Sequence, residues 1–247
     1  MAFDFDGTLS EIVPRPEDAV LDPALAPSLE RLAEMAGYLA VISARDRAAL
    51  ANRVPAYVLT LGSYGLELPE SISASGYPDG FDPVAARDSL DAVAHDIDAA
   101  VARWPGARLE RKTWGLAVHF RGGAEAYYAA PATLAEIQGL AERHGCRAVK
   151  GRLVVEVEPP GAVDKGWAVR HLAGALGPSG TVFTGDDLGD APAWRAVRDL
   201  GAVMPTVAVG IRSAEIPASE LDGCDVVLEN RGELSGLVGR LLEMAEE

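Results

Sequence analysis

The amino terminus combines a short apolar stretch with two closely spaced acids and a glycine turn. Asp4 and Asp6 lie on alternate residues, directly before Gly7, in the run Asp4-Phe5-Asp6-Gly7-Thr8-Leu9-Ser10. Side chains two residues apart in a strand point the same way, so both carboxylates are expected to reach one ligand. Paired acids at the carboxyl end of a strand suit a hard cation and a phosphoryl group. An ordinary strand that ends in an Asx-rich turn is the alternative.

Three later segments also place polar residues where a strand should end or a helix should begin. An apolar run ends at Ser43, Lys165 opens a helical pattern, and an acidic cluster follows Thr181–Thr184. The acids of that cluster are Asp186, Asp187 and Asp190. Taken singly, Ser43 could be a strand-end cap, Lys165 a surface lysine and the acids a helix N-cap. Three acids exceed what a cap needs, which favours a metal site.

In this order, the four segments resemble the four motifs of the haloacid dehalogenase superfamily, whose members mostly form and hydrolyse an aspartyl-phosphate. The resemblance implies that Asp4 is the nucleophile and that Asp6 acts as acid and then base, a role that needs a raised pKa from burial and nearby carboxylates. Ser43 and Lys165 would stabilise the charge on the transferring group. The resemblance further implies Mg²⁺ as cofactor, with a set of aspartates around it. Asp4, Asp6 and Asp186 would be its ligands, Asp6 through its backbone carbonyl, with Asp187 and Asp190 in support.

Both ends of the chain alternate β-rich runs with helical patterns, which predicts a parallel sheet covered by helices, an α/β fold. The strands are expected at Ala2–Asp6, Tyr38–Ser43, Tyr57–Gly62, Thr181–Thr184, Thr206–Gly210 and Val226–Glu229. The helices are expected at Ala24–Met35, Asp46–Asn52, Lys165–Leu176, Ala191–Ala196 and Glu233–Ala245. By the resemblance this is a Rossmann-like, haloacid dehalogenase-like core.

The middle of the chain has a periodicity of its own. It predicts an amphipathic helix over Val84–Arg103, with Val84, Leu90, Val93, Ile97 and Val101 on or near one stripe. The further elements are strands at Arg108–Lys112, Leu116–Arg121, Cys146–Lys150 and Leu153–Val157, and a helix at Pro131–His144. We therefore expect an inserted α/β domain over residues 82–160, between core segments 1–81 and 161–247. In the superfamily, an insert at this position is a cap domain.

A narrower resemblance, to the trehalose-6-phosphate phosphatase family, covers nearly the whole chain. It rests on Val41-Ile42-Ser43-Ala44-Arg45, Gly62-Ser63-Tyr64-Gly65-Leu66-Glu67, Glu110-Arg111-Lys112, Val118-His119-Phe120-Arg121 and Glu156 before Pro159-Pro160-Gly161. The resemblance implies that a set of charged residues binds the sugar and orients the phosphate. These are Arg45, Glu67, Glu110, Lys112, Arg121, Arg152 and Glu156.

Each of these charged residues has a plain structural alternative. Alternating charges on a hairpin usually form its solvated face, His119 and Trp114 could pack against the cap helices, and Arg45 could cap its own helix. The chain also departs from the family pattern. Ala44 stands where Gly is usual, Tyr64 where His is frequent, and Gly189 and Ala191 where Thr and Glu are commoner. These departures leave the hydrolytic residues in place and bear on the identity of the sugar.

Composition and charge narrow the classes of function. The chain has 247 residues, is 49% hydrophobic and 24% charged, and carries a formal net charge of −15. This charge argues against nucleic acid and anionic membranes as partners. Because the negative net charge repels a phosphorylated substrate, a divalent cation and local Lys and Arg residues are required to reverse the electrostatic potential at the site. No apolar run approaches the length of a membrane-spanning helix, and no signal peptide opens the chain. The two cysteines are far apart in the sequence and are expected to be reduced thiols. We therefore expect a cytoplasmic monomer.

The expected function is therefore Mg²⁺-dependent hydrolysis of a small-molecule sugar phosphate, with trehalose 6-phosphate as the leading substrate. The alternatives are another sugar-phosphate phosphatase, acting on sucrose 6-phosphate or on a glucosyl- or mannosyl-3-phosphoglycerate, a phosphohexomutase, and a non-catalytic sugar-phosphate-sensing domain. A sensing domain should have lost at least one of Asp4, Asp6, Lys165 and Asp186, and all four are present. Only three residues precede Asp4, so we expect either that the natural chain begins upstream or that the first strand is frayed.

Overall fold

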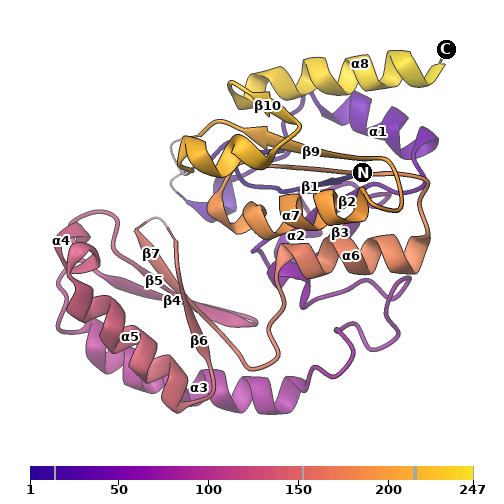
Figure 1. Cartoon of the computed structure of the whole chain (residues 1–247). Coiled ribbons are helices and arrows are strands. Elements are labelled where there is room, and N and C mark those ends of the chain that lie inside the picture. The colour runs from indigo at the N-terminus through magenta and orange to yellow at the C-terminus, as the bar shows by residue number, and fades with distance from the viewer. Residues whose placement is uncertain (14, 152, 214–215, 247) are drawn as a thin grey trace. The chain divides into compact units, whose positions relative to one another are not determined.

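The computed structural model describes residues 1–13, 15–151, 153–213 and 216–246, and it divides into two compact units. The first, the core, joins Met1–Pro78 to Val163–Glu247, and the second, the cap, is Asp79–Ala162 (Figure 1). The core is therefore assembled from both ends of the chain, with the cap inserted between them.

The core sheet has six parallel strands in the order β10-β9-β8-β1-β2-β3. These strands are β1 Ala2–Phe3, β2 Ala40–Ile42, β3 Leu59–Leu61, β8 Thr181–Gly185, β9 Thr206–Ile211 and β10 Val226–Leu228. β1 pairs with β2 on one side and with β8 on the other. Because parallel strands end at the same edge of a sheet, the residues that follow β1, β2 and β8 are neighbours there.

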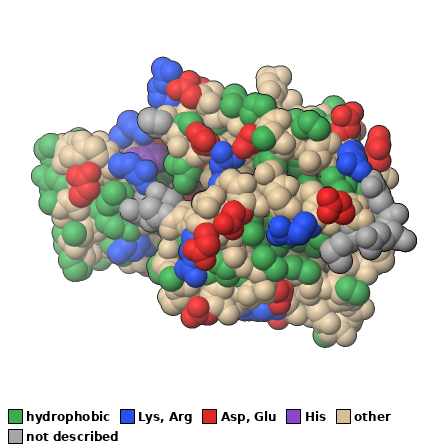
Figure 2. All heavy atoms as spheres, turned by 90° about the horizontal axis from the view of Figure 1, so that it is seen from above, with side chains coloured by type: hydrophobic (Ala, Val, Ile, Leu, Met, Phe, Trp, Pro, Cys, Tyr) green, Lys and Arg blue, Asp and Glu red, His purple; other side chains and the backbone are tan. Residues whose placement is uncertain are grey.

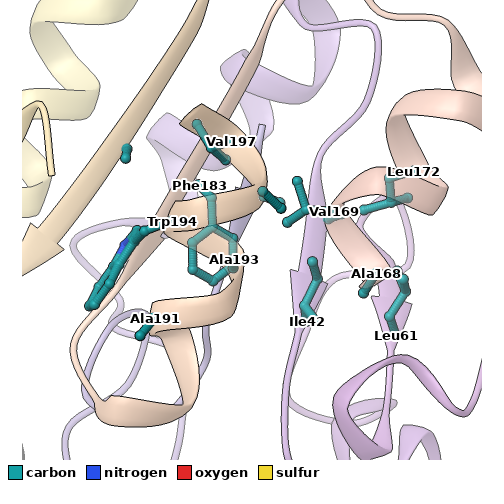
Figure 3. Close-up of a cluster of buried hydrophobic side chains, with 14 of the residues drawn as sticks. Ile42, Leu61, Ala168, Val169, Leu172, Phe183, Ala191, Ala193, Trp194 and Val197 are labelled. Carbon is teal, nitrogen blue, oxygen red and sulfur yellow. The ribbon is translucent and has the colours of Figure 1, made fainter. Parts of the chain in front are cut away.

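Helices cover both faces of this sheet, as expected for buried parallel strands. They are α1 Ala26–Met35, α2 Arg47–Leu50, α6 Lys165–Leu176, α7 Ala191–Leu200 and α8 Leu234–Glu246, with 3₁₀ turns at η1 Pro16–Asp18, η2 Ser63–Gly65, η3 Leu188–Asp190, η4 Ala218–Gly223 and η5 Arg231–Glu233. Figure 3 shows one face, where α6 and α7 pack their apolar side chains onto Ile42, Leu61 and Phe183. Phe3 belongs to the opposite core cluster, with α1 and α8. Successive strand residues thus serve the two cores in turn.

The first strand is shorter than predicted, but it is not frayed. Ala2 and Phe3 each pair with both neighbouring strands. The Asp4 amide still donates to the Thr184 carbonyl at 2.9 Å, and then the chain turns, with Gly7 at φ +83°. The strand therefore ends before Asp6, so the alternation of a strand does not orient Asp4 and Asp6.

The cap contains an antiparallel sheet in the order β4-β5-β7-β6, with α3 and α5 packed against one face (Figure 1). Its elements are α3 Pro83–Val101, β4 Arg108–Lys112, β5 Gly115–His119, α4 Glu125–Ala129, α5 Pro131–Arg143, β6 Arg147–Lys150 and β7 Val154–Glu158. Asp82 caps α3 by accepting hydrogen bonds from the amides of Val84 and Ala85. Val84 lies in the first turn and is 69% exposed, so its predicted place on the buried stripe is wrong. Helix α4 was not among the elements predicted for this part of the chain.

The surface drawn in Figure 2 mixes acidic and basic side chains, and the acidic excess is not gathered into one patch on that face. None of the helices in the described part of the chain is both long enough and apolar enough to cross a membrane.

Candidate active site

The carboxyl edge of the core sheet brings together residues from three of the four predicted motifs. Asp4 follows β1, Ser43 follows β2 and Asp186 follows β8, and these three strands are adjacent. All three side chains are buried. Three polar side chains buried at one sheet edge, at the position where α/β proteins bind ligands, mark a candidate site.

Lys165, the first residue of α6, lies at the centre of this edge. Its Nζ is 2.6 Å from Asp4 Oδ1 and 2.7 Å from Asp190 Oδ1, and the side chain is 2% exposed. Burial alone would lower the pKa of Lys165, but Asp190, Asp4 and Asp187 together raise it well above its ordinary value. The lysine is therefore charged and holds the Asp4 carboxylate by both charge and hydrogen bonding.

Asp190 organises the loop after β8. Its Oδ2 accepts hydrogen bonds from the amides of Asp186 and Asp187, at 2.9 and 3.1 Å, while its Oδ1 accepts from Lys165. Both oxygens are thus engaged within the protein. The hydroxyl of Ser213 donates to the Asp186 carbonyl at 2.8 Å and fixes the same loop from β9. The Asp190 carboxylate thus holds the backbone of Asp186 and Asp187 together with the Lys165 ammonium group.

The residues around Asp186 fit a divalent cation. Asp4, Asp186 and Asp190 have carboxylate oxygens within 4.8 Å of one another. Asp186 Oδ1 accepts a hydrogen bond from Thr8 at 3.1 Å, whereas its buried Oδ2 has no partner among the described residues. Burial, aided by the charges of Asp4, Asp190 and Asp187, raises the pKa of Asp186 to about 9. A hard cation would satisfy the oxygen and favour the ionised carboxylate.

Burial also raises the pKa of Asp4, to about 6, against the opposing charge of Lys165. Gly7 lies against this cluster at a positive φ, and a Cβ there would overlap the Asp186 carboxylate. The turn after β1 must therefore be glycine for the carboxylates to approach one another.

Asp6 has a different environment from the one predicted. Its side chain is partly exposed, and its closest charged partner is a guanidinium rather than another carboxylate. Arg45 donates to both Asp6 oxygens at 2.7 Å and to the Pro16 carbonyl at 2.8 Å. Asp6 lies three residues beyond the end of β1, and Arg45 holds both of its carboxylate oxygens. Arg45, predicted to contact substrate, contacts Asp6.

The loop after β3 supports the Ser43 turn. Ser63 and Tyr64 both have positive φ values, 48° and 61°, although neither is glycine. In this conformation the Tyr64 amide donates to the Ser43 carbonyl at 2.8 Å, and the Ser63 amide to the Arg45 carbonyl at 2.9 Å. Glu67, predicted to contact sugar, accepts hydrogen bonds from the Ser63 hydroxyl and the Arg47 amide. Backbone strain of this kind clusters at functional sites.

In the cap, the predicted sugar residues lie partly as expected. Glu110 and Lys112 share one face of β4, and Glu156 lies on β7, two strands away, with β5 between them. Lys112 Nζ reaches across to Glu156 Oε1 at 2.7 Å. Arg121 was expected within the second cap strand, but β5 ends at His119. Arg152 lies outside the described residues.

Three polar residues contact candidate site residues but were not predicted to do so from the sequence. They are Thr8, Ser213 and His119. Thr8 is in the first motif and could have been flagged by its place beside the glycine turn. His119 Nε2 is 2.7 Å from Glu110 Oε2 rather than packed against the cap helices. The alternation of side chains along β5, which pairs with β4, could have placed His119 on the same face of the sheet as Glu110. Nothing local in the sequence points to Ser213.

The family model described as Trehalose-phosphatase matches residues 2–223. The chain belongs to the trehalose-phosphatase family. A trehalose-phosphate phosphatase of Mycobacterium ulcerans is 32% identical over 251 residues, covering 97% of this chain and 60% of that protein.

Two further comparisons show how much of this trehalose-phosphatase family member its relatives share. An uncharacterized glycosyl hydrolase of Mycobacterium tuberculosis is 38% identical over 211 residues, which are 80% of this chain but 15% of that protein. The solved C-terminal domain of a Candida albicans trehalose-6-phosphate phosphatase shares the fold, with a TM-score of 0.74 at 21% identity, covering 98% of this chain and 91% of that one. The chain thus spans between about a seventh and three fifths of the length of these curated relatives.

Proposed function

We propose that this chain is a phosphoric monoester hydrolase that converts trehalose 6-phosphate to trehalose and phosphate, with Mg²⁺ and through an aspartyl-phosphate. One observation carries the proposal. Lys165 is buried between Asp4 and Asp190, beside an Asp186 oxygen that has no protein partner in the described structure. This arrangement leaves one carboxylate, Asp4, held in place and next to a cation site, as a phosphoryl acceptor requires.

In the first step, an Asp4 carboxylate oxygen attacks phosphorus and the bond from phosphorus to the sugar oxygen breaks. Asp6 gives a proton to that leaving oxygen. In the second step, Asp6 takes a proton from water, the water oxygen attacks phosphorus, and the bond to Asp4 breaks. Lys165 and the Ser43 hydroxyl stabilise the charge on the transferring group throughout.

Asp4 and Asp186 would hold Mg²⁺, together with the backbone carbonyl of Asp6. When bound, the cation screens the repulsion between the attacking carboxylate and the anionic substrate and neutralises charge that develops on the phosphoryl oxygens. The unpartnered Asp186 oxygen and the absence of a Cβ at Gly7 support this placement.

The sugar is proposed to bind to charged residues of the cap sheet, above all Glu110, Lys112 and Glu156. Carboxylates and ammonium groups are suited to hydroxyls because they form charge-assisted hydrogen bonds. Lys112 and Glu156 bind one another at 2.7 Å and are each partly exposed. We therefore expect Glu156→Gln to impair turnover of the sugar phosphate while sparing small artificial esters.

The decisive experiment is phosphate release with Mg²⁺ from trehalose 6-phosphate, sucrose 6-phosphate, glucose 6-phosphate and glucosyl-3-phosphoglycerate. We expect strong preference for the first, and no turnover by Asp4→Asn, which replaces the nucleophile with a group of the same shape. Preference for another sugar phosphate would refute the substrate and keep the chemistry. Turnover by Asp4→Asn would refute the nucleophile.

A non-catalytic sensing role is the second candidate, and absence of turnover of every ester by the folded protein would favour it. The intact Asp4, Asp6, Lys165 and Asp186 argue against it. A cytoplasmic location and a monomeric state stay predictions from the sequence.

A further inference from the structure

The cap sheet has an open face, which we define as the face turned away from α3 and α5. On the helix-covered face, Leu116, Val118, Val155 and Val157 are buried, and Arg111 of β4 binds Asp98 of α3. Because side chains alternate along a strand, the intervening residues form the open face. They are Arg108, Glu110 and Lys112 of β4, Gly115, Ala117 and His119 of β5, and Val154, Glu156 and Glu158 of β7.

Two polar pairs cross the open face. Glu110 of β4 and Glu156 of β7 both lie opposite Ala117 of the middle strand. Lys112 binds Glu156, as described above, and His119 Nε2 is 2.7 Å from Glu110 Oε2. In the register of the sheet, His119 lies directly opposite Arg108, so its contact with Glu110 is a diagonal one. Each glutamate therefore has one oxygen held by a side chain from a different strand.

The Glu110–His119 hydrogen bond has a defined direction. The bond from His119 is the largest of several influences that lower the pKa of Glu110, and nearby Lys112 acts in the same sense. An ionised carboxylate can only accept, so Nε2 of His119 carries the proton in this bond. The other oxygen, Glu110 Oε1, accepts no hydrogen bond from the described residues. It remains an acceptor on a carboxylate that His119 holds through the other oxygen.

We infer that His119 is a positioning residue for sugar recognition: it fixes the Glu110 carboxylate so that Oε1 is presented to a sugar hydroxyl. This inference rests on the proposed function, since it assumes that the ligand of the open face carries hydroxyl groups. A glutamate side chain that is held before binding loses less conformational freedom when the ligand arrives. His119 does not need to touch the sugar to raise affinity for it.

The cap contains a second histidine–carboxylate pair that serves as a control. His144 Nε2 lies 2.9 Å from Asp96 Oδ2, and their side chains are 27% and 35% exposed, against 28% and 35% for His119 and Glu110. Asp96 belongs to α3 and His144 follows α5, so this pair is in the helix layer and not on the open face. The two pairs match in exposure and differ in location, and Asp96 also has Arg143 Nη2 at 3.5 Å.

The test measures kcat and KM of the full chain with Mg²⁺ for trehalose 6-phosphate and for p-nitrophenyl phosphate, which has no sugar hydroxyls. His119→Ala is expected to raise KM for the sugar phosphate about tenfold, the scale of one hydrogen bond to a charged group, with little change in kcat. His119→Gln, whose amide nitrogen can take the place of Nε2, should restore most of the affinity. His144→Ala should leave both substrates unchanged, and all variants should turn over p-nitrophenyl phosphate like the wild type.

A double variant separates positioning from general structural support. If His119 acts through Glu110, adding His119→Ala to Glu110→Gln should cause little further rise in KM. Additive losses, an unchanged KM in His119→Ala, or an equal loss with p-nitrophenyl phosphate would each overturn the inference while the wild type still hydrolyses trehalose 6-phosphate. A wild type that hydrolyses p-nitrophenyl phosphate but no sugar phosphate would refute the proposed function, and the inference with it.

Discussion

Arg45 holds the carboxylate of Asp6 with two hydrogen bonds of 2.7 Å, one from Nε and one from Nη2. The remaining guanidinium nitrogen, Nη1, donates to the Pro16 carbonyl. The arginine therefore joins the proposed acid–base residue to the loop that follows the first motif. A planar guanidinium in such a bidentate contact fixes direction as well as distance.

Removing this contact should disorient Asp6. We expect Arg45→Ala to lower kcat for phosphate release by about 10- to 100-fold, because a misplaced catalytic group costs rates of this order. Arg45→Lys should recover little of the loss, since an ammonium cannot make the two parallel bonds. The matched control is Arg53→Ala. Arg53 holds the same loop through the carbonyls of Ala19 and Glu17, and none of its hydrogen bonds within the described part of the chain goes to a carboxylate. An equal loss in both variants would show that the loop alone matters.

Lys165 should be required for folding stability as well as for turnover. Lys165→Ala leaves the buried carboxylates of Asp4 and Asp190 without their cation, so the free energy of unfolding should fall by about 3–5 kcal/mol. Arg147→Ala is the comparison, because the Arg147 side chain that pairs with Glu158 is 63% exposed, and an ion pair made by an exposed side chain contributes about 0–1 kcal/mol. Urea unfolding monitored by circular dichroism measures both. Equal effects would contradict the buried geometry.

Gly7→Ala should impair the site through overlap with Asp186. We expect about 1–3 kcal/mol of destabilisation from the strained backbone and a large loss of phosphate release, because the new Cβ displaces the Asp186 carboxylate. Gly177→Ala provides the control, since Gly177 also has a positive φ, 55°, but nothing lies within 4 Å of its added Cβ. That variant should lose stability and keep its turnover. Turnover retained in Gly7→Ala would contradict the close approach of Gly7 and Asp186.

Removal of metal should make stability depend on pH through the buried acids. The pKa of Asp186 is raised from 3.8 to about 9 and that of Asp4 to about 6, so the folded state binds these protons more tightly than the unfolded state does. Their contribution to stability is complete below about pH 4 and is lost as pH rises, through about 6 for Asp4 and about 9 for Asp186. In EDTA, the free energy of unfolding should therefore fall between pH 6 and 8.5.

Two additions sharpen this measurement. Mg²⁺ should restore stability most at the alkaline end, because a bound cation favours the ionised acids. Asp186→Asn should flatten the fall above pH 6, since the amide does not titrate. A slope in Asp186→Asn equal to that of the wild type would show that other groups cause the dependence.

The sequence was sufficient to predict which segments form helices and strands, but not how the side chains are arranged at the edge of the sheet. Lys165–Leu176 and Arg108–Lys112 form over their predicted residues, because capping residues and alternation mark them locally. Asp82 and Pro83 define the start of α3, but the buried stripe begins one turn later, so Val84 remains exposed. Local patterns predict which element forms, while the face that it buries depends on how the layers pack.

The same holds for the site: its motif residues could be predicted, whereas the contacts that some of them make could not. The motifs that place Asp4, Ser43, Lys165 and Asp186 could be recognised, and parallel pairing of β1, β2 and β8 brings their strand ends together. The partner of Asp6 could not be predicted, because it depends on where the first strand ends and on a loop 39 residues later. The engagement of Glu67 with Ser63 also escaped prediction, since it follows from two residues with positive φ.

The placement of the cap between the two core segments has a consequence for synthesis of the chain. β1 lies between β2 and β8, and the Thr8–Asp186 hydrogen bond joins residues 178 positions apart. On a ribosome, β1 emerges early and keeps one edge unpaired until the whole cap and β8 have followed it. Contacts within the cap are shorter in range and can form during that interval. The residues of the candidate site can then come together only after β8 has emerged.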